Sequence, residues 1–265
     1  MLKKDSKGNL AEVNPIRTRK DSIYQKGTNS IFRVSRSKLS SFIDCKRCFY
    51  LDRVKGLKEP SMPGWSLNTA VDELLKKEFD KYRKLKKPHP IMIENNLNFV
   101  PYENEKMDLW REPKTGGISY VDKDTNLEIY GGVDDIWFDK DSEELVVVDY
   151  KAQSSSRLVE AEDYLSSPFH QGYKRQMDIY VYILREMGFK TSDRVFFLVC
   201  NGEKSYDQFD KKLNFTTTLV PYKSNTSNIK NVIKEMKIVL ELDYVPAINK
   251  SCEKCMYLET GKTLI

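Results

Sequence analysis

A short apolar run lies within Glu144–Lys151, whose centre reads LVVV. A run this apolar predicts a central strand covered on both faces. Side chains alternate between the two faces of a strand. Four residues therefore share one face: Leu145, Val147, Asp149 and Lys151. The predicted strand ends with a carboxylate and an ammonium group on one covered face, where charges are costly unless they are paired or bind an ion.

The same patterns predict the other elements. Apolar spacing typical of amphipathic helices indicates helices over 35–54, with Ser35 or Ser37 as N-cap, and over 66–85, 168–188 and 229–242. Alternation broken by turn residues indicates strands over 91–102, 117–151, 194–200, 206–209 and 215–220. The order of helix, antiparallel meander, helix, strand and helix predicts an α/β fold, a central mixed sheet flanked by helices.

Charge and length suggest one domain with an arm. The 265 residues are 40% apolar, enough for a single core over 35–265. Residues 1–38 hold ten Lys or Arg and three Asp or Glu, and 1–34 show no periodicity. We expect 1–34 to be a basic flexible arm that either follows a phosphate backbone or is a solvated tail. With no apolar run of membrane length and no hydrophobic N-terminal signal, we expect a soluble cytoplasmic protein without a membrane partner.

Several polar residues have positions that suggest a site. The acidic pair Asp134 and Asp135 lies on the strand before Asp149, and two acidic strands plus a lysine suit a divalent cation. Gln176 and Tyr180 lie four residues apart on one face of the 168–188 helix. A glutamine in an apolar stripe must find partners, either as a satisfied core amide or in a polar site.

Other residues of these helices have plainer interpretations. Asp72 lies at the edge of the 66–85 stripe, either as a surface carboxylate or reaching into a cleft. Phe169 belongs to the predicted apolar arc of the 168–188 helix. We expect the tryptophans to pack in a core or cleft rather than to stack on bases: Trp65, Trp110 and Trp137.

Four of the five cysteines form two CxxC pairs, Cys45 with Cys48 and Cys252 with Cys255. In a reducing compartment such pairs indicate metal binding before disulfides. By count, four thiolates hold Zn²⁺ or a [4Fe–4S] cluster equally well. The alternative for the first pair is that both are small buried residues of a helix, and Cys200 is expected to be plain core.

Three motifs in order resemble the PD-(D/E)XK nuclease superfamily: GxxD at Gly131–Asp134, DxK at Asp149–Lys151 and QxxxY at Gln176–Tyr180. The resemblance covers residues 35 to 260 and is nearest to RecB-type nucleases and the CRISPR-associated exonucleases of spacer acquisition. It implies a restriction-endonuclease-like core of αβββαβ order. The opening SKLSSFIDCKRCFYL and the closing CEKCMY also resemble parts of that branch.

The resemblance implies a role for each site residue. Asp134, Asp149 and the backbone carbonyl of Tyr150 would hold Mg²⁺ or Mn²⁺, and Asp72 stands where many members have a further ligand. Lys151 would orient or help deprotonate the attacking water and screen the phosphate. Gln176 and Tyr180 would hold the scissile strand or the lysine. Period-2 counting favours Asp135 over Asp134 as the ligand, so Asp135 stays as the alternative.

For the cysteines the resemblance favours a [4Fe–4S] cluster over Zn²⁺, although iron–sulfur relatives have one cysteine upstream and three near the C-terminus. Here the distribution is two and two: Cys45 and Cys48, then Cys252 and Cys255.

These observations predict a metal-dependent DNA nuclease, an exonuclease on DNA ends or single strands, in repair, recombination or mobile-element defence. TGKT at 260–263 lacks the first glycine of a P-loop, so we expect no ATPase here and a separate helicase or a recombination or adaptation protein as partner. One alternative is a catalytically inactive nucleic-acid-binding module stabilised by a four-cysteine metal site. Another is an α/β domain whose acidic pair only forms ion pairs with Lys151.

Overall fold

The computed structural model describes residues 2–62 and 64–265. Met1 of the predicted arm and Pro63 lie outside the described residues. The chain forms two compact units. The terminal unit consists of Met1–Gly64, Val121–Ile129 and Lys230–Ile265, and the sheet unit of Trp65–Tyr120 and Tyr130–Ile229. The division into an arm and one domain stays a prediction.

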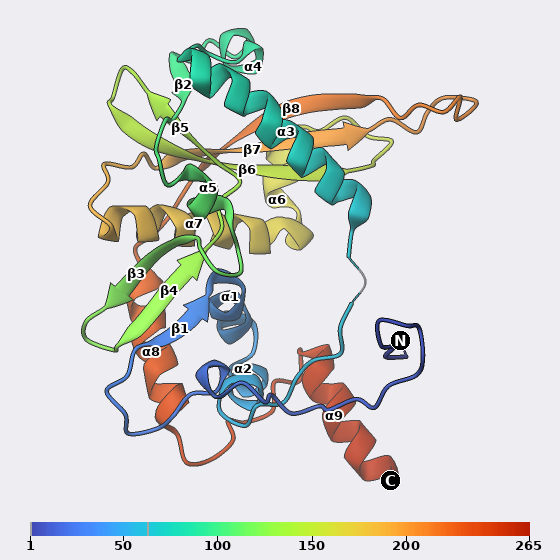
Figure 1. The fold of residues 1–265 in the computed structure, drawn as a ribbon, viewed down its shortest axis with the longest axis vertical. Helices are drawn as coiled ribbons and strands as arrows, with labels where there is room; N and C mark the ends of the chain where they lie inside the picture. The colour runs from blue at the N-terminus through green and yellow to red at the C-terminus, as the bar shows by residue number, and fades with distance from the viewer. Residues whose placement is uncertain (1, 63) are drawn as a thin grey trace. The chain divides into compact units, whose positions relative to one another are not determined.

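The sheet unit is built on five strands in the order β2-β5-β6-β7-β8 (Figure 1). Only β6 and β7 run parallel, and the other neighbours are antiparallel. Helix α7 joins the parallel pair, as parallel strands require a crossover. The strands are β2 (Phe99–Pro101), β5 (Asp135–Asp139), β6 (Glu144–Gln153), β7 (Arg194–Gly202) and β8 (Phe215–Lys223). This mixed sheet flanked by helices confirms the predicted fold class.

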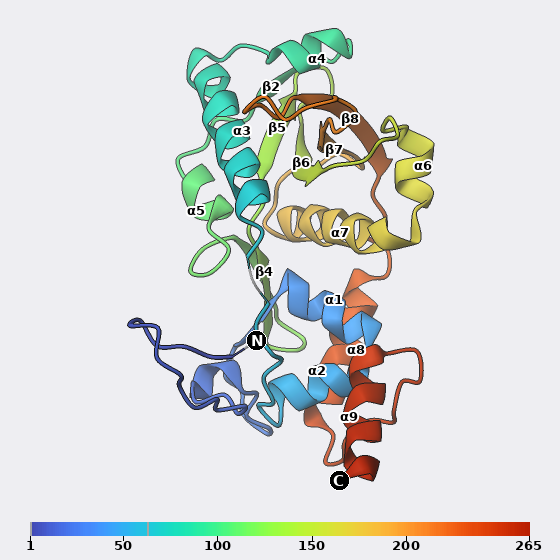
Figure 2. The same ribbon diagram turned by 90° about the vertical axis from the view of Figure 1, so that its right-hand side faces the viewer.

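Helices cover the sheet on both sides, with α3 and α4 on one face and α6 and α7 on the other (Figure 2). They are α3 (Ser66–Leu85), α4 (Pro90–Glu94), α5 (Met107–Arg111), α6 (Ala161–Ser166), the 3₁₀ turn η2 (Pro168–His170) and α7 (Gln171–Glu186). Phe79 of α3 packs 5.4 Å from Trp137 and 5.7 Å from Tyr150, measured between ring centroids. Val146, Val148 and Tyr150 belong to this core and Asp149 faces α7, so β6 alternates as predicted.

Some predicted elements of the sheet unit were wrong. The start of the predicted strand 91–102 is helix α4, which Pro90 begins and His89 caps by accepting the N–H of Ile91. Residues 206–209 form no strand, and β8 is longer than predicted. In α3, the expected apolar stripe is only partly buried, since Leu67 and Leu74 are exposed.

The terminal unit contains the sheet β1-β4-β3 and four α-helices among the described residues. Its elements are η1 (Lys20–Ser22), β1 (Phe32–Ser35), α1 (Arg36–Asp44), α2 (Lys46–Arg53), the end of β3 (Ile118–Asp122), the start of β4 (Leu127–Gly131), α8 (Ile229–Glu241) and α9 (Glu253–Leu264). Ser35 caps α1 by accepting the N–H of Lys38, as predicted. The predicted helix 35–54 is instead two helices, because Cys45 has an extended backbone, with φ at −158°.

Part of the predicted arm contacts its own unit. Tyr24 is buried, and its hydroxyl forms a hydrogen bond with Glu241. Arg17 forms an ion pair with buried Asp52. Arm residues are therefore in part structural, and the flexibility of the arm stays a prediction. Among the described residues, no helix is both long and apolar enough to cross a membrane.

We expect Phe79→Ala to destabilise the protein by about 3–5 kcal/mol, because it removes the ring that joins α3 to the sheet. The free energy of unfolding in urea measures this. Leu74→Ala on the same helix is the matched control and should cost no more than about 0.5 kcal/mol, since Leu74 is exposed. Equal losses in both variants would contradict the observed burial.

Candidate active site

Asp149 is the most deeply buried carboxylate at the end of β6, with none of its surface exposed. One oxygen accepts a hydrogen bond from Nε2 of Gln176 at 2.6 Å, and the other forms an ion pair with Lys151. Burial of a charge is tolerated when partners compensate it. The structure therefore brings three sequence-predicted residues together on the α7 face of the sheet.

Tyr180 connects this cluster to the start of β5. Its hydroxyl accepts from Nε2 of Gln176 at 3.2 Å and donates to the carbonyl oxygen of Gly132 at 2.6 Å. Gly132 belongs to the connection that ends at Asp134. The QxxxY spacing thus puts Gln176 on Asp149 and Tyr180 on the turn that carries Asp134.

The carboxylate of Asp134 lies beside the same strand. It accepts the backbone N–H of Tyr150 at 2.8 Å, and its other oxygen lies 3.7 Å from Nζ of Lys76. Burial and the nearby charge of Asp149 raise the pKa of Asp134 to about 7, against the opposing effect of Lys151 and Lys76. Burial and the charge of Asp149 therefore disfavour ionisation of Asp134, an effect that a bound cation relieves.

Asp135 occupies a different environment, although it adjoins Asp134. It is fully buried, and its carboxylate forms ion pairs with Arg83 and Arg111. The other oxygen accepts from the hydroxyl of Tyr150 at 2.9 Å and from Nε1 of Trp137 at 3.3 Å. Asp135 and Trp137 point to the same face of β5, as counting alternate residues predicted. That face packs against the core, and none of its described side chains lines the hollow beside β6.

A hollow of about 360 Å³ opens between the start of α3 and the end of β6. Its lining residues include four of the predicted site: Asp72, Asp134, Tyr150 and Lys151. Asp72 forms an ion pair with Lys76 at 2.7 Å, and burial together with Asp134 raises the pKa of Asp72. The carboxylates of Asp72 and Asp134 thus share one lysine.

Sequence reasoning missed several residues of this site. Nζ of Lys151 lies 4.5 Å from the ring centroid of Tyr173, a cation–π contact from α7. Asn68 of α3 donates to the carbonyl of Ala152 at 3.1 Å. Arg111 donates through Nε to the carbonyl of Asp134 at 3.1 Å. Their partners lie far away in the sequence, so no local pattern reveals them.

The donor set suits a hard divalent cation, which prefers carboxylate and carbonyl oxygens. Tyr150 points its N–H at Asp134, and the N–H and C=O of one strand residue point to the same edge. Its carbonyl therefore lies on the Asp134 side of β6. Among the described residues, the only group of three or more metal-ligating side chains already gathered is the cysteine group described next.

The two CxxC pairs meet in the terminal unit. Cys45 and Cys48 lie at the start of α2, and Cys252 and Cys255 at the start of α9. All four Sγ atoms lie within 4.8 Å of one another, with separations of 3.3 Å between Cys45 and Cys255 and 3.7 Å between Cys48 and Cys252. The thiol atoms have the separations of a metal site, so the four cysteines can bind a metal ion.

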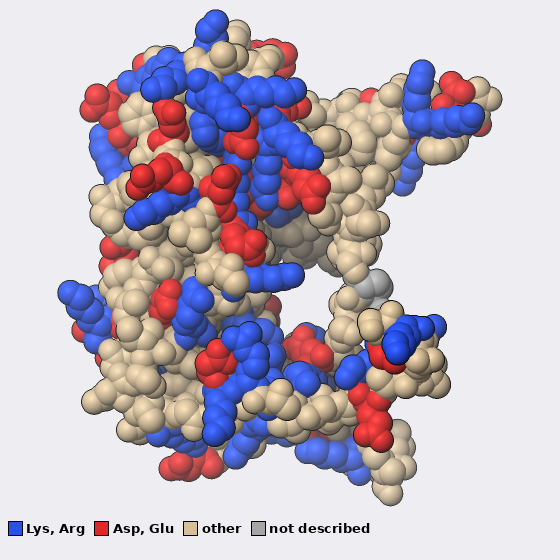
Figure 3. Space-filling view, in the orientation of Figure 1, with Lys and Arg blue, Asp and Glu red and all other residues tan. Residues whose placement is uncertain are grey.

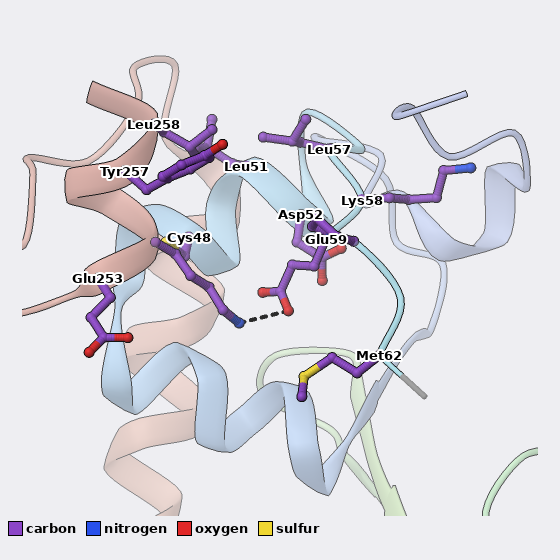
Figure 4. Close-up of a pocket in the computed structure, with 12 residues that line it drawn as sticks. Cys48, Leu51, Asp52, Leu57, Lys58, Glu59, Met62, Glu253, Tyr257 and Leu258 are labelled. Atoms are coloured by element: carbon purple, nitrogen blue, oxygen red, sulfur yellow. Dashed lines mark ion pairs between the residues drawn. The ribbon is translucent and has the colours of Figure 1, made fainter. Parts of the chain in front are cut away.

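The electrostatic environment differs between cysteines of this group. Burial raises the pKa of Cys45 to about 11 and raises that of Cys48 as well, whereas at Cys252 hydrogen bonds outweigh burial and lower the pKa. Cys48 also borders an apolar hollow lined by Leu51, Met62 and Tyr257 (Figure 4). Cys200, the fifth cysteine, is buried in β7 and lies outside this group, as predicted.

The family model of the PD-(D/E)XK nuclease superfamily matches residues 33–260. The chain therefore belongs to the PD-(D/E)XK nuclease superfamily. Its members are nucleases that use divalent metal ions, so nucleic acid is the substrate class of this chain.

Among solved structures, the chain is similar to a candidate exonuclease from Eubacterium rectale. The two are 15% identical with a TM-score of 0.40, and the match covers 84% of this chain and 86% of the other. No curated protein matches the chain.

The two neighbouring aspartates should respond oppositely to neutralisation in a metal-free buffer. Asp135→Asn should cost about 3–5 kcal/mol of unfolding free energy, because two buried guanidinium groups lose their carboxylate. Asp134→Asn should cost nothing or stabilise the protein at pH 7.5. Burial and the charge of Asp149 raise the pKa of Asp134 to about 7, so above that pH the folded protein carries an ionised, desolvated carboxylate that asparagine lacks. Urea unfolding with EDTA measures both. A large loss for Asp134→Asn would show that Asp134 is a structural residue.

Proposed function

We propose that this chain is a divalent-metal-dependent DNA nuclease that acts as an exonuclease on DNA ends or single strands. The observation that carries the proposal is the geometry around β6. Asp149 and Lys151 form an ion pair, Gln176 holds Asp149, and Asp134 lies against the next residue, Tyr150. If the ion pair between Asp149 and Lys151 had only a structural role, it would require neither the nearby carboxylate of Asp134 nor an open hollow.

Asp134, Asp149 and the carbonyl of Tyr150 would hold Mg²⁺ or Mn²⁺, with Asp72 as a further ligand from α3. Such a cation lowers the pKa of a bound water and neutralises charge on the phosphate. The remaining residues position these ligands: Gln176 fixes Asp149, while Tyr180 fixes the carbonyl of Gly132. Asp135 is not proposed as a ligand, since its carboxylate lies on the core face and pairs with two guanidinium groups, those of Arg83 and Arg111.

Lys151 has two partners that favour its ammonium form, the carboxylate of Asp149 and the ring of Tyr173. Burial lowers the pKa of Lys151, but Asp149 and Asp134 outweigh that effect, so its pKa is raised. A lysine that stays charged serves best by donating to a water or a phosphate oxygen. We therefore favour charge screening and orientation over proton abstraction as its role.

Lysines on α3 provide a surface for the phosphate backbone. Residues 76–87 contain seven Lys or Arg and two Asp or Glu. Lys77, Lys81 and Lys84 are exposed, and Figure 3 shows Lys and Arg gathered over α3. Because Lys76 also contacts Asp134, this surface leads to the hollow.

The proposal also includes DNA as the substrate and the RecB-like or CRISPR-associated branch of the superfamily. It includes a role in repair, recombination or mobile-element defence, with a separate helicase or adaptation protein as partner.

For the cysteines we infer a single tetrahedral ion, Zn²⁺. With Zn–S bonds of about 2.3 Å, the sulfurs of a tetrahedral site lie about 3.8 Å apart. The observed separations of 3.3, 3.5 and 3.7 Å are close to this value. A [4Fe–4S] cluster, which the resemblance favours, places iron and sulfide atoms between the thiolates and holds them further apart.

Purified protein should be colourless and contain one zinc ion per chain. Cys45→Ser and Cys252→Ser should each lower the zinc content and the melting temperature, because metal binding contributes folding free energy to such sites. Cys200→Ala is the matched control and should keep its zinc. Metal analysis and a visible absorption spectrum measure these outcomes. A brown protein containing iron and inorganic sulfide would overturn the choice of zinc in favour of the cluster.

Lys151→Ala should lower cleavage of linear DNA by at least about 10²-fold in Mg²⁺ or Mn²⁺, since it removes a charge aimed at the phosphate. The assay uses end-labelled single- and double-stranded DNA, with circular DNA to test the need for an end. The variant should have a lower melting temperature, because buried Asp149 loses its ion-pair partner, but at the assay temperature it should stay folded and bind DNA with near wild-type affinity. If the wild type binds DNA but leaves it intact with either metal, the chain is instead a binding module held by its cysteine site.

A further inference from the structure

Two aromatic side chains that the sequence pattern assigns to packing are exposed. Phe169 is 88% exposed and Trp65 is 72% exposed, whereas Trp110 and Trp137 are buried as expected. Neither exposed residue is explained by the core. Each directly precedes a helix that contributes to the catalytic hollow: Trp65 is the N-cap of α3, and Phe169 lies in η2 before α7.

The position of Phe169 is fixed by its neighbour. His170 forms a hydrogen bond between Nδ1 and the carbonyl oxygen of Tyr164 at 2.8 Å and stacks on Tyr173 with ring centroids 5.2 Å apart. The ring of Tyr173 in turn lies under Nζ of Lys151. Phe169 therefore lies one residue from a stack that ends at Lys151, and its own ring faces solvent.

Trp65 lies within one turn of the other wall of the hollow. Its carbonyl accepts both the N–H and the Oγ1 hydroxyl of Thr69, at 3.0 and 3.1 Å. Thr69 and Asn68 line the hollow, and Asn68 is tied to the carbonyl of Ala152 in β6. In Figure 2 the end of β6 lies between the start of α3 and the segment from α6 to α7. Trp65 and Phe169 thus lie just before the two helices that supply Asn68, Thr69 and Tyr173 to the lining of the hollow.

We propose that Trp65 and Phe169 are base-stacking residues that make unpaired nucleotides the preferred substrate at this site. Exposed rings beside a lysine-bearing phosphate site are the combination that binds single strands, because every unpaired base offers a ring face and every nucleotide a phosphate. The bases of a duplex are already stacked on each other, so only a frayed end or a single strand can use both rings. This inference deepens the proposed nuclease function and rests on it.

The test measures binding separately from cleavage. The wild-type protein in EDTA is titrated onto a fluorescent single-stranded oligonucleotide, onto the same length of abasic strand, and onto the matching blunt duplex. Phe169→Ala and Trp65→Ala should each weaken binding to the single strand roughly tenfold. Their salt dependence should match that of the wild type, since no phosphate contact is removed. Phe169→Tyr and Trp65→Phe should restore most of the affinity.

Two further measurements exclude a general surface effect. Tyr244→Ala, which removes an exposed ring of the terminal unit, should leave the affinity unchanged. Binding of a single strand should quench tryptophan fluorescence, and the quenching should disappear in Trp65→Phe, because the other two tryptophans are buried.

Stacking would be disproved by variants that bind the base-containing strand as tightly as the wild type. It would equally be disproved by variants that lose the same affinity for the abasic strand. The nuclease proposal fails separately. If the wild type shows the stacking signature but no metal-dependent cleavage, the rings serve a binding module; if it cleaves while the alanine variants are unchanged, only the stacking proposal is wrong.

Discussion

The buried carboxylate of Asp135 determines the geometry of the candidate site. Its desolvation costs several kcal/mol, which ion pairs with Arg83 and Arg111 offset. Arg111 also donates to the carbonyl of Asp134 and pairs with Asp80 of α3. The first residue of β5 is therefore fixed to two helices at once. Because Asp135 faces the core, Asp134 is turned toward β6 and the hollow.

Two adjacent aspartates thus acquire different chemistry from their surroundings alone. Asp135 meets guanidinium, indole and phenol donors that match its charge, so it has no capacity left for a ligand. Asp134 meets one N–H and a distant lysine, and it also faces the charge of Asp149. The first arrangement stabilises the fold. The second leaves excess negative charge beside open space, which is the electrostatic condition for holding a divalent cation.

The sequence predicted several features of the site that depend on local order. The apolar run before Asp149 predicted a central strand with correct faces, and the Gln176–Tyr180 spacing predicted one helical face turned to the site. Period-2 counting through Gly131–Asp135 described the strand parity correctly and placed Asp135 on the face of Trp137, which is the core face. Counting alternate residues could not show that the carboxylate of Asp135 meets two arginines in the core, since Arg83 and Arg111 come from distant segments.

Other misses have the same origin. The helix break at Cys45 places this residue in the four-cysteine group, whose second CxxC pair lies two hundred residues later in the chain. The exposure of Phe169 follows from His170 turning toward Tyr164 and Tyr173. Helical spacing records which residues share a face, but not whether a neighbouring element covers that face. The predicted core was therefore most reliable within β6, where neighbours on both sides are fixed by strand pairing.

The four cysteines come from two segments of the terminal unit that are far apart in the sequence. The terminal unit is assembled from three separated segments, and most of the sheet unit's sequence lies between the two CxxC pairs. Closing so long a loop costs conformational entropy, although the cost grows only slowly with length. A metal ion bound by α2 and α9 supplies free energy only when both segments are in place. Such an ion would therefore stabilise the contact between α2 and α9, which lie far apart in the sequence.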